Sequence, residues 1–204
     1  MTGNHLVHVV DDDVDVRKSL GFLLATADFA VRLYESATAF LATATGNLDG
    51  CIVTDVRMPG IDGIEFLRQL RTRGHTLPVI VMTGHADVAL AVQAMKEGAA
   101  DFIEKPFDDE LLIEAIRSAL DSRNRTETTH PQGVEIRGRL AALSERERQV
   151  LDGLVSGLPN KTIAYDLGIS PRTVEIHRAN VMSKMAASSL SHLVRMALVV
   201  ESKR

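Results

Sequence analysis

Residues 5–13 read HLVHVVDDD, an apolar run rich in valine that leads directly into three aspartates. Such a run predicts a buried strand that ends near residue 10. Comparable runs occupy residues 29–34, 51–54, 78–82 and 101–103, and the segments between them place apolar residues at every third or fourth position, as helices do. Strands that alternate with helices predict a parallel sheet covered on both faces. We therefore expect an α/β doubly wound, flavodoxin-like domain with a five-stranded parallel sheet.

The pattern changes after residue 120. Residues 121–133, DSRNRTETTHPQG, are polar and contain Pro131 and Gly133, which is typical of a linker. After this segment no strand pattern returns, and the remaining residues have helical spacing. We expect a first domain over residues 1–122, a linker over residues 123–138, and an all-α second domain over residues 139–204.

Helix signals in the second domain predict a helix-turn-helix. Ser144 and Glu147 form a capping-box pattern ahead of an apolar stripe. Gly168 is placed to end one short helix, and Ser170-Pro171 is placed to begin the next. Two helices joined by a tight glycine turn are typical of a DNA-binding unit whose second helix reads the major groove. The polar side chains of that helix are equally compatible with an ordinary solvated face.

Charge is distributed unevenly between the two domains. Residues 1–122 carry 10 Lys and Arg against 19 Asp and Glu, whereas residues 139–204 carry 10 against 6. An acidic first domain and a basic second domain suggest a cation as partner of the first and a polyanion as partner of the second, although small domains also differ in charge by chance. The apolar stretches are too short to cross a membrane, and the single cysteine, Cys51, excludes an internal disulfide. We expect a cytoplasmic protein.

The carboxyl ends of the predicted strands carry the most unusual residues. In a doubly wound sheet these ends meet in one crevice. Carboxylates held this close need a cation, and oxygen ligands suit Mg²⁺. A lysine and a threonine beside such an ion could hold a phosphoryl group. Any one of the acids, Asp13 in particular, could instead cap a helix. The residues at the strand ends are Asp11, Asp12, Asp13, Asp55, Thr83 and Lys105.

Four segments together resemble the receiver domain of two-component response regulators: VVDDD (9–13), TDVRMPGIDGIEFL (54–67), MTGHADV (82–88) and DFIEKPF (101–107). The resemblance covers residue 4 to about residue 121. It implies that Asp55 accepts a phosphoryl group, that Lys105 contacts the phosphate, and that Thr83 and Phe102 form a switch pair.

The same resemblance implies a metal site. Asp12, Asp55 and the backbone carbonyl of Arg57 would bind Mg²⁺ or Mn²⁺ directly, and Asp11 would act through water. This agrees with the oxygen-rich chemistry expected at the strand ends.

Residues 143–185, LSERERQVLDGLVSGLPNKTIAYDLGISPRTVEIHRANVMSKM, are similar to the four-helix effector domain of LuxR-type regulators. The resemblance implies that some residues of the reading helix face base edges and that others reach phosphates or neighbouring bases. Glu175 departs from the family, where this position is often basic, and glutamate would more naturally accept from a cytosine amino group. Base-edge candidates are Glu175, Ile176 and Ala179; phosphate candidates are Lys161, Arg172 and Arg178; Thr173 and Lys184 are further exposed candidates.

These resemblances imply a transcription activator rather than an enzyme, similar along its whole length to rhizobial regulators of nitrogen-fixation or microaerobic genes. Its partners would be a sensor histidine kinase, promoter DNA, RNA polymerase and a second phosphorylated copy, with a monomer otherwise and no membrane. Two alternatives are a Mg²⁺-dependent phosphatase with an aspartyl nucleophile and a DNA-binding protein that needs no phosphorylation. The helix-turn-helix argues against the first, and the complete set of acids argues against the second.

Overall fold

A computed structural model of the chain describes residues 5–46, 48–84, 88–124 and 129–201. Its contacts divide the chain into two compact units. The first unit comprises residues up to 86 together with residues 97–126, and the second comprises residues 87–96 together with residues 127–204. No helix in the described part of the chain has the length and hydropathy needed to span a membrane.

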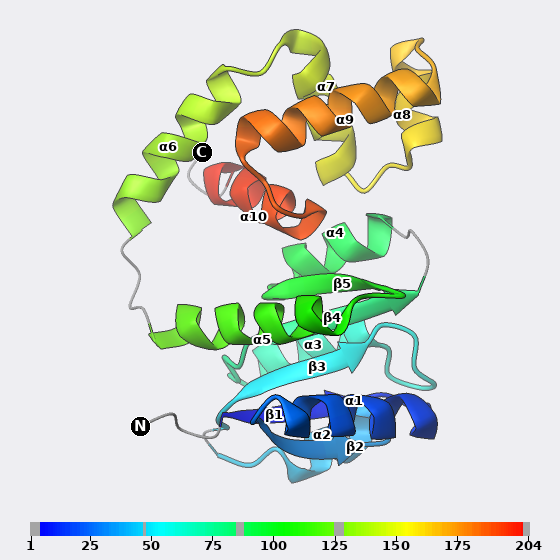
Figure 1. Cartoon of the computed structure of the whole chain (residues 1–204), viewed down its shortest axis with the longest axis vertical. Helices are drawn as coiled ribbons and strands as arrows, with labels where there is room; N and C mark the ends of the chain where they lie inside the picture. The colour runs from blue at the N-terminus through cyan, green and yellow to red at the C-terminus, as the bar shows by residue number, and fades with distance from the viewer. Residues whose placement is uncertain (1–4, 47, 85–87, 125–128, 202–204) are drawn as a thin grey trace. The chain divides into compact units, whose positions relative to one another are not determined.

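The first unit is built on a five-stranded sheet with the order β2-β1-β3-β4-β5 (Figure 1). Every neighbouring pair of strands is parallel. The expected doubly wound α/β fold is therefore confirmed. The strands are β1 (Leu6–Val10), β2 (Ala30–Tyr34), β3 (Cys51–Asp55), β4 (Val79–Gly84) and β5 (Asp101–Lys105).

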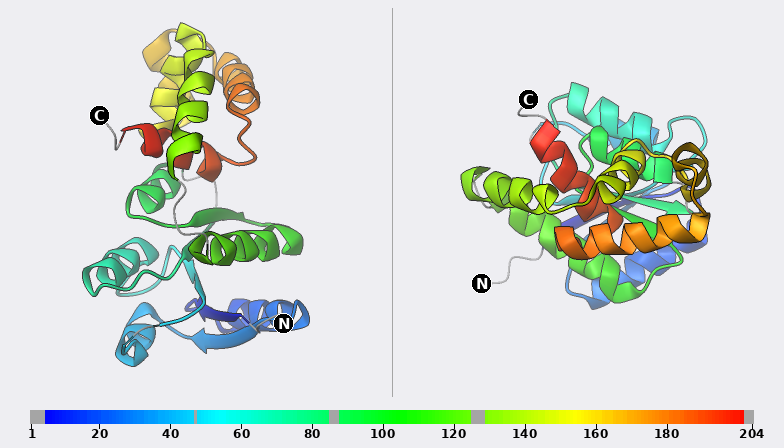
Figure 2. Two further views of the ribbon diagram at one scale, coloured as in Figure 1. Left: turned by 90° about the vertical axis from the view of Figure 1, so that its left-hand side faces the viewer. Right: turned by 90° about the horizontal axis from the view of Figure 1, so that it is seen from above.

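Helices cover both faces of this sheet. Figure 2 shows α1 (Val14–Thr26) and α5 (Asp109–Asn124) on one side, and α2 (Ala37–Thr43) and α3 (Gly63–Thr72) on the other. The α1 and α5 side buries a continuous cluster that includes Val9, Val53 and Ile116. The opposite side holds aromatic side chains, with Phe40 packed edge-on against Phe66 and His8. The central strands are thus buried on both faces, as parallel sheets require.

The second unit is helical. Its core is formed by apolar residues of α6 to α10, among them Ile136, Leu154, Val174, Val181 and Leu193. The helices α8 and α9 form the expected helix-turn-helix: Gly168 caps α8 in the left-handed conformation, and Ser170 caps α9 with Pro171 in its first turn. The helices are α4 (Val88–Lys96), α6 (Thr129–Ala141), α7 (Glu145–Val155), α8 (Asn160–Leu167), α9 (Pro171–Met185) and α10 (Leu190–Glu201).

The segment expected as a linker is largely helical. Helix α5 continues to Asn124 and α6 covers residues 129–141, while residues 125–128 lie outside the described residues. Pro131 falls in the first turn of α6, where a helix tolerates proline because no intrahelical N–H bond is lost. Arg139 donates from Nη1 to the carbonyl of Met185 at 2.8 Å, so α6 also contacts the end of α9. Most of residues 123–138 is therefore helical, which the proline and glycine signals alone did not reveal.

The capping box at the start of α7 is confirmed and extends farther than its sequence pattern. The Glu147 side chain accepts from the Ser144 amide at 2.7 Å, and the Ser144 hydroxyl accepts from the Glu147 amide at 3.3 Å. Lys184 near the end of α9 donates to the same Glu147 carboxylate at 2.7 Å. These contacts, the lysine contact first, lower the pKa of Glu147 to about 2. One buried carboxylate thus joins the start of α7 to the end of α9.

Replacing Glu147 by glutamine should make the stability of the second unit less dependent on pH. The folded-state pKa lies below the ordinary value of 4.5, so the ionised carboxylate stabilises the fold above pH 4.5. That contribution is lost as the pH falls from about 4.5 to about 2. We expect E147Q to unfold more easily than the unsubstituted chain at pH 7, with the difference shrinking across this range.

Denaturant unfolding followed by circular dichroism at several pH values measures this effect. E145Q is the matched control, because Glu145 lies in the same helical turn but is exposed. A stability difference for E147Q that stays constant from pH 7 to pH 2 would contradict the assignment.

Candidate functional site

Strand alternation brings three charged side chains to one face of the sheet at its carboxyl edge. Asp11 follows Val7 and Val9, Asp55 follows Cys51 and Val53, and Lys105 follows Ile103, all at intervals of two residues. Successive side chains of a strand point to opposite faces, so residues two apart share a face. The apolar members of these series belong to the cluster under α1 and α5. Their polar ends therefore converge just beyond that cluster.

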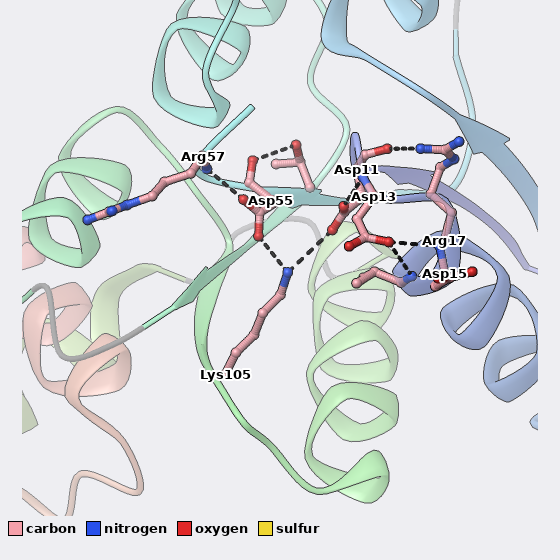
Figure 3. A network of polar contacts seen from close by, with 9 residues as sticks. Asp11, Asp13, Asp15, Arg17, Asp55, Arg57 and Lys105 are labelled. Atoms are coloured by element: carbon pink, nitrogen blue, oxygen red, sulfur yellow. Dashed lines mark hydrogen bonds and ion pairs between the residues drawn. The ribbon is translucent and has the colours of Figure 1, made fainter. Parts of the chain in front are cut away.

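The three side chains are in direct contact (Figure 3). The Lys105 ammonium donates to Oδ1 of Asp55 at 2.6 Å and to Oδ2 of Asp11 at 3.3 Å. The second oxygen of Asp55 accepts from the backbone amide of Arg57 at 2.6 Å. Asp11 is 2% exposed and Asp55 is 8% exposed. One ammonium group thus lies between two buried carboxylates.

The charges of this cluster shift one another's titration. Burial raises the pKa of Asp11, and the hydrogen bond from the Asp13 amide and the charge of Lys105 only partly oppose it. Burial alone would lower the pKa of Lys105, but its hydrogen bond to Asp55 and the charges of Asp55 and Asp11 outweigh burial and raise it. The site therefore has more negative than positive charge and favours an added cation.

The loop after β1 is held by its own polar contacts. Asp13 caps α1, since its side chain accepts from the amides of Asp15 and Val16, as expected for a helix N-cap. Arg17, one turn into α1, donates to the carbonyl of Asp11 at 2.6 Å. Arg17 was not among the predicted site residues. An arginine in the first turns of a helix that follows an acidic strand end could have indicated this contact. These contacts fix the backbone that carries the Asp11 carboxylate.

The residues fit Mg²⁺ in their chemistry. Asp11, Asp12, Asp55 and the Arg57 carbonyl offer only oxygen ligands, and burial raises the pKa of Asp11, so a nearby cation would favour its ionised form. Asp12 is exposed, whereas Asp11 and Asp55 are buried. No group of three acidic, histidine or cysteine side chains suited to a metal occurs in the described part of the chain. Lys105 thus joins Asp11 and Asp55, and the part of Asp12 in a metal site stays a prediction.

Thr83 and Phe102 lie on neighbouring strands and share a face. Phe102 pairs with Val81 in the register of β4 and β5, and Thr83 is two residues beyond Val81. The Thr83 hydroxyl is buried, and Oγ1 has no hydrogen-bond partner among the described residues. A buried hydroxyl without a partner costs free energy, which makes it ready to bind an incoming acceptor. Phe102 is partly buried.

Helix α9 presents a distinct outer face in the second unit. Val174, Val181 and Met185 are fully buried, whereas Ile176 is 56% exposed. An exposed isoleucine flanked by polar side chains suits contact with a thymine methyl group in the major groove. The other predicted contact residues on α8 and α9 are exposed or partly exposed: Lys161, Arg172, Glu175, Arg178 and Ala179.

Two predicted DNA-contact residues are engaged within the unit itself. Thr173 shares a 2.8 Å hydrogen bond between its hydroxyl and that of Ser170, which belongs to the cap of α9. Lys184 is paired with the buried Glu147 carboxylate. Helical spacing placed both on the outer side of α9 but could not show these partners. Both side chains therefore have a partner within the unit, and their contact with DNA stays a prediction.

Comparison with known proteins agrees with the geometry of both units. Residues 7–117 match the response regulator receiver domain family, and residues 141–197 match the bacterial regulatory proteins of the luxR family. The chain belongs to the FixJ-like response regulators. It is 60% identical over 193 residues to the transcriptional regulatory protein FixJ of Azorhizobium caulinodans, covering 95% of this chain and 92% of that protein. It is 57% identical over 195 residues to FixJ of Rhizobium meliloti, covering 96% of both chains.

Solved structures show the same arrangement of domains along the chain. Full-length FixJ from B. japonicum is 48% identical, with a TM-score of 0.57, and the match covers 98% of this chain and 99% of that one. The chain is thus a two-component transcription regulator with a receiver and a LuxR-type DNA-binding domain, and its family is one of regulators, not of enzymes. Receiver domains generally bind Mg²⁺ at their phosphorylation site, and the regulator family implies a sensor kinase and promoter DNA as partners.

Replacing Thr83 by valine should leave the receiver as stable as before or stabilise it by about 1 kcal/mol, because the substitution removes an unpaired buried hydroxyl. Thr54→Val is the matched control, since the fully buried Thr54 hydroxyl donates to the Asp55 carbonyl at 3.1 Å. We expect T54V to lower the free energy of unfolding of the receiver by about 1 kcal/mol. The two variants are compared by urea unfolding, using the unfolding transition of the receiver. Equal losses of stability in the two variants would show that the Thr83 hydroxyl has a hydrogen-bond partner.

Proposed function

We propose that this regulator is switched by transfer of a phosphoryl group from a histidine kinase to Asp55. The observation that carries the proposal is the buried Asp55 carboxylate, held between the Lys105 ammonium and the Arg57 amide. A nucleophile held in one orientation avoids much of the entropic cost of reaction. The unpaired Thr83 hydroxyl supports the proposal as a donor for a phosphoryl oxygen.

In the proposed step, an oxygen of Asp55 forms a bond to phosphorus while the bond from phosphorus to the kinase's histidine nitrogen breaks. The freed electron pair returns to the imidazole, and the product is an aspartyl phosphate. Lys105 would move from carboxylate to phosphoryl oxygens, which keeps its charge paired throughout. The receiver would assist this transfer and the later hydrolysis without being a metabolic enzyme.

Asp11, Asp12, Asp55 and the Arg57 carbonyl would hold Mg²⁺ or Mn²⁺ in the working protein. When bound, the ion supplies positive charge that neutralises the phosphoryl oxygens. Asp11 contributes a carboxylate already fixed by the Asp13 amide at 2.9 Å. Asp12 follows on the exposed side of the same loop, where it can turn toward an ion without unfolding a strand.

Phosphorylation would be read out through Thr83 and Phe102. A phosphoryl oxygen at Asp55 offers the Thr83 hydroxyl the partner it lacks. Because Phe102 lies on the same face of the neighbouring strand, movement of Thr83 changes the space open to the phenyl ring. The receiver surface so altered would favour a dimer, whereas the unphosphorylated chain would be monomeric.

Dimerisation would place two DNA-binding domains on adjacent half-sites of a promoter. Glu175, Ile176 and Ala179 would face base edges, and Lys161, Arg172 and Arg178 would reach phosphates or neighbouring bases.

We assign the receiver to residues 1–122 and the DNA-binding domain to residues 139–204, joined through residues 123–138. The regulator would act in the cytoplasm with RNA polymerase. Its FixJ relatives favour nitrogen-fixation or microaerobic genes as targets and a FixL-like kinase as phosphoryl donor.

Replacing Asp55 by asparagine should abolish phosphorylation, because the amide is a far poorer nucleophile. Incubation of the full chain with acetyl phosphate and Mg²⁺, followed by intact-mass measurement, gives the stoichiometry. Asp13→Asn is the matched control, since asparagine caps a helix as well as aspartate and should leave incorporation complete. If D55N still incorporated one phosphoryl group per chain and this group were released in alkali, the acceptor would be another residue.

Replacing Arg178 by alanine should weaken DNA binding and reduce the salt slope by about 1 if the guanidinium neutralises one phosphate. The measurement is fluorescence anisotropy of a site selected from random DNA, titrated at several salt concentrations. Arg137→Ala is the control, because Arg137 is an exposed cation of α6 and lies outside the helix-turn-helix. An unchanged slope for R178A would remove Arg178 from the DNA interface.

A further inference from the structure

The backbone on both sides of Asp12 is restrained by hydrogen bonds (Figure 3). The peptide group before Asp12 contains the Asp11 carbonyl, which accepts from Nη1 of Arg17 at 2.6 Å. The peptide group after it contains the Asp13 amide, which donates to Oδ1 of Asp11 at 2.9 Å. A peptide group is planar, so a hydrogen bond to one of its atoms restrains the whole plane. These two contacts therefore set the direction in which the Asp12 side chain leaves the loop.

Asp11 itself is held from several elements of the receiver. Its amide donates to the Tyr34 carbonyl at 3.2 Å, and its Oδ2 accepts from Lys105 at 3.3 Å. Together with the two contacts above, every polar group of Asp11 has a partner. Of these four partners, only Arg17 belongs to a helix, and Leu20 anchors that helix, α1, in the core. Arg17 thus ties the loop that carries Asp11 and Asp12 to a rigid part of the unit.

Helix stability does not account for a cation at this position. Arg17 is the fourth residue of α1, and the dipole at the start of a helix favours negative charge. Arg17 also contacts a residue of the proposed metal site, and its charge would repel the ion. The guanidinium group therefore either neutralises the nearby aspartates or holds the loop in place.

These two roles predict opposite effects on ion binding. If Arg17 only neutralises the aspartates, its removal leaves the site more negative and a divalent cation binds more tightly. If Arg17 holds the loop, its removal lets the peptide groups around Asp12 move, and the cation binds more weakly. Loss of a hydrogen bond to a metal ligand commonly weakens metal binding by about 10- to 100-fold.

We propose that Arg17 is a positioning residue of the ion site and that its hydrogen bond to the Asp11 carbonyl increases the affinity for Mg²⁺ or Mn²⁺. The proposal rests on the proposed function, in which Asp11 and Asp12 help to hold the ion. The hydrogen bond restrains the loop before the ion arrives, so less conformational freedom is lost on binding. This gain outweighs the repulsion between the guanidinium group and the ion.

The test measures Mn²⁺ binding to the unphosphorylated full chain, using the electron paramagnetic resonance signal of the free ion. Arg17→Met removes the guanidinium group but keeps an unbranched side chain, and we expect it to weaken Mn²⁺ binding about tenfold. Lys18→Met is the matched control, because Lys18 is the next residue of α1 and is exposed. K18M removes the same charge and should bind Mn²⁺ at least as tightly as the unsubstituted chain. Asp12→Asn identifies the part of the signal that belongs to this site.

A second measurement reports on the loop without any metal. Hydrogen exchange of the Asp13 amide, followed by NMR, should become about fivefold faster in R17M, because the restraint on the loop is lost. The same rate should be unchanged in K18M. Far-UV circular dichroism verifies that R17M is folded, and if it is not, Arg17→Gln is judged by the same two measurements.

Equal or tighter Mn²⁺ binding by R17M would overturn the proposal and leave Arg17 as a neutralising charge. Equal weakening by R17M and K18M would also overturn it, as would weaker binding by R17M with an unchanged exchange rate. Failure of the proposed metal site is recognised separately, because the unsubstituted chain and D12N would then bind Mn²⁺ equally. In that case the exchange rate decides: a faster rate in R17M supports the positioning role of Arg17, and an unchanged rate overturns it.

Discussion

A single ammonium group between two buried carboxylates holds the functional edge of the sheet together. Lys105 contacts both Asp55 and Asp11, and these three residues come from three strands that are distant in sequence. Two desolvated carboxylates repel each other, so neither β1 nor β3 could end in this way without β5. The contact requires the strands to pair in the observed register, because a shift of one residue would turn any of the three side chains to the other face.

In the proposed switch, Thr83 and Phe102 respond to phosphorylation. Thr83 and Phe102 lie near the carboxyl ends of the neighbouring strands β4 and β5 and share a face there. Asp11 and Asp55 share one Lys105 ammonium, whereas the buried Thr83 hydroxyl has no hydrogen-bond partner among the described residues. A buried hydroxyl without a described partner suits a change that begins with one new hydrogen bond and shifts the end of a strand.

The sequence was most informative where structure depends on neighbouring residues. Valine-rich runs predicted all five strands, and the Ser144 and Glu147 pattern predicted a capping box that the structure contains. Contacts between residues distant in sequence could not be predicted: the pairing of Lys184 with Glu147 spans 37 residues, and helical spacing showed only that Lys184 lies outside the buried stripe. Pro131 did not indicate the helix that contains it, because a proline is compatible with either a linker or the first turn of a helix. For Asp12, the sequence shows a carboxylate that could bind a metal ion, but it does not show how far this carboxylate lies from the other ligands.

The ends of α9 are fixed while its outer face is left unconstrained. Ser170 caps one end, Arg139 and the Glu147–Lys184 pair hold the other, and the buried stripe of Val174, Val181 and Met185 secures the middle. None of these contacts uses the side chains of Glu175, Ile176 or Ala179. If these three residues face base edges as proposed, substitutions there would alter the recognised base sequence with little penalty in stability. Mutations on this one face of α9 could then redirect such a regulator to new promoters during evolution. Its fold and its receiver domain would remain unchanged.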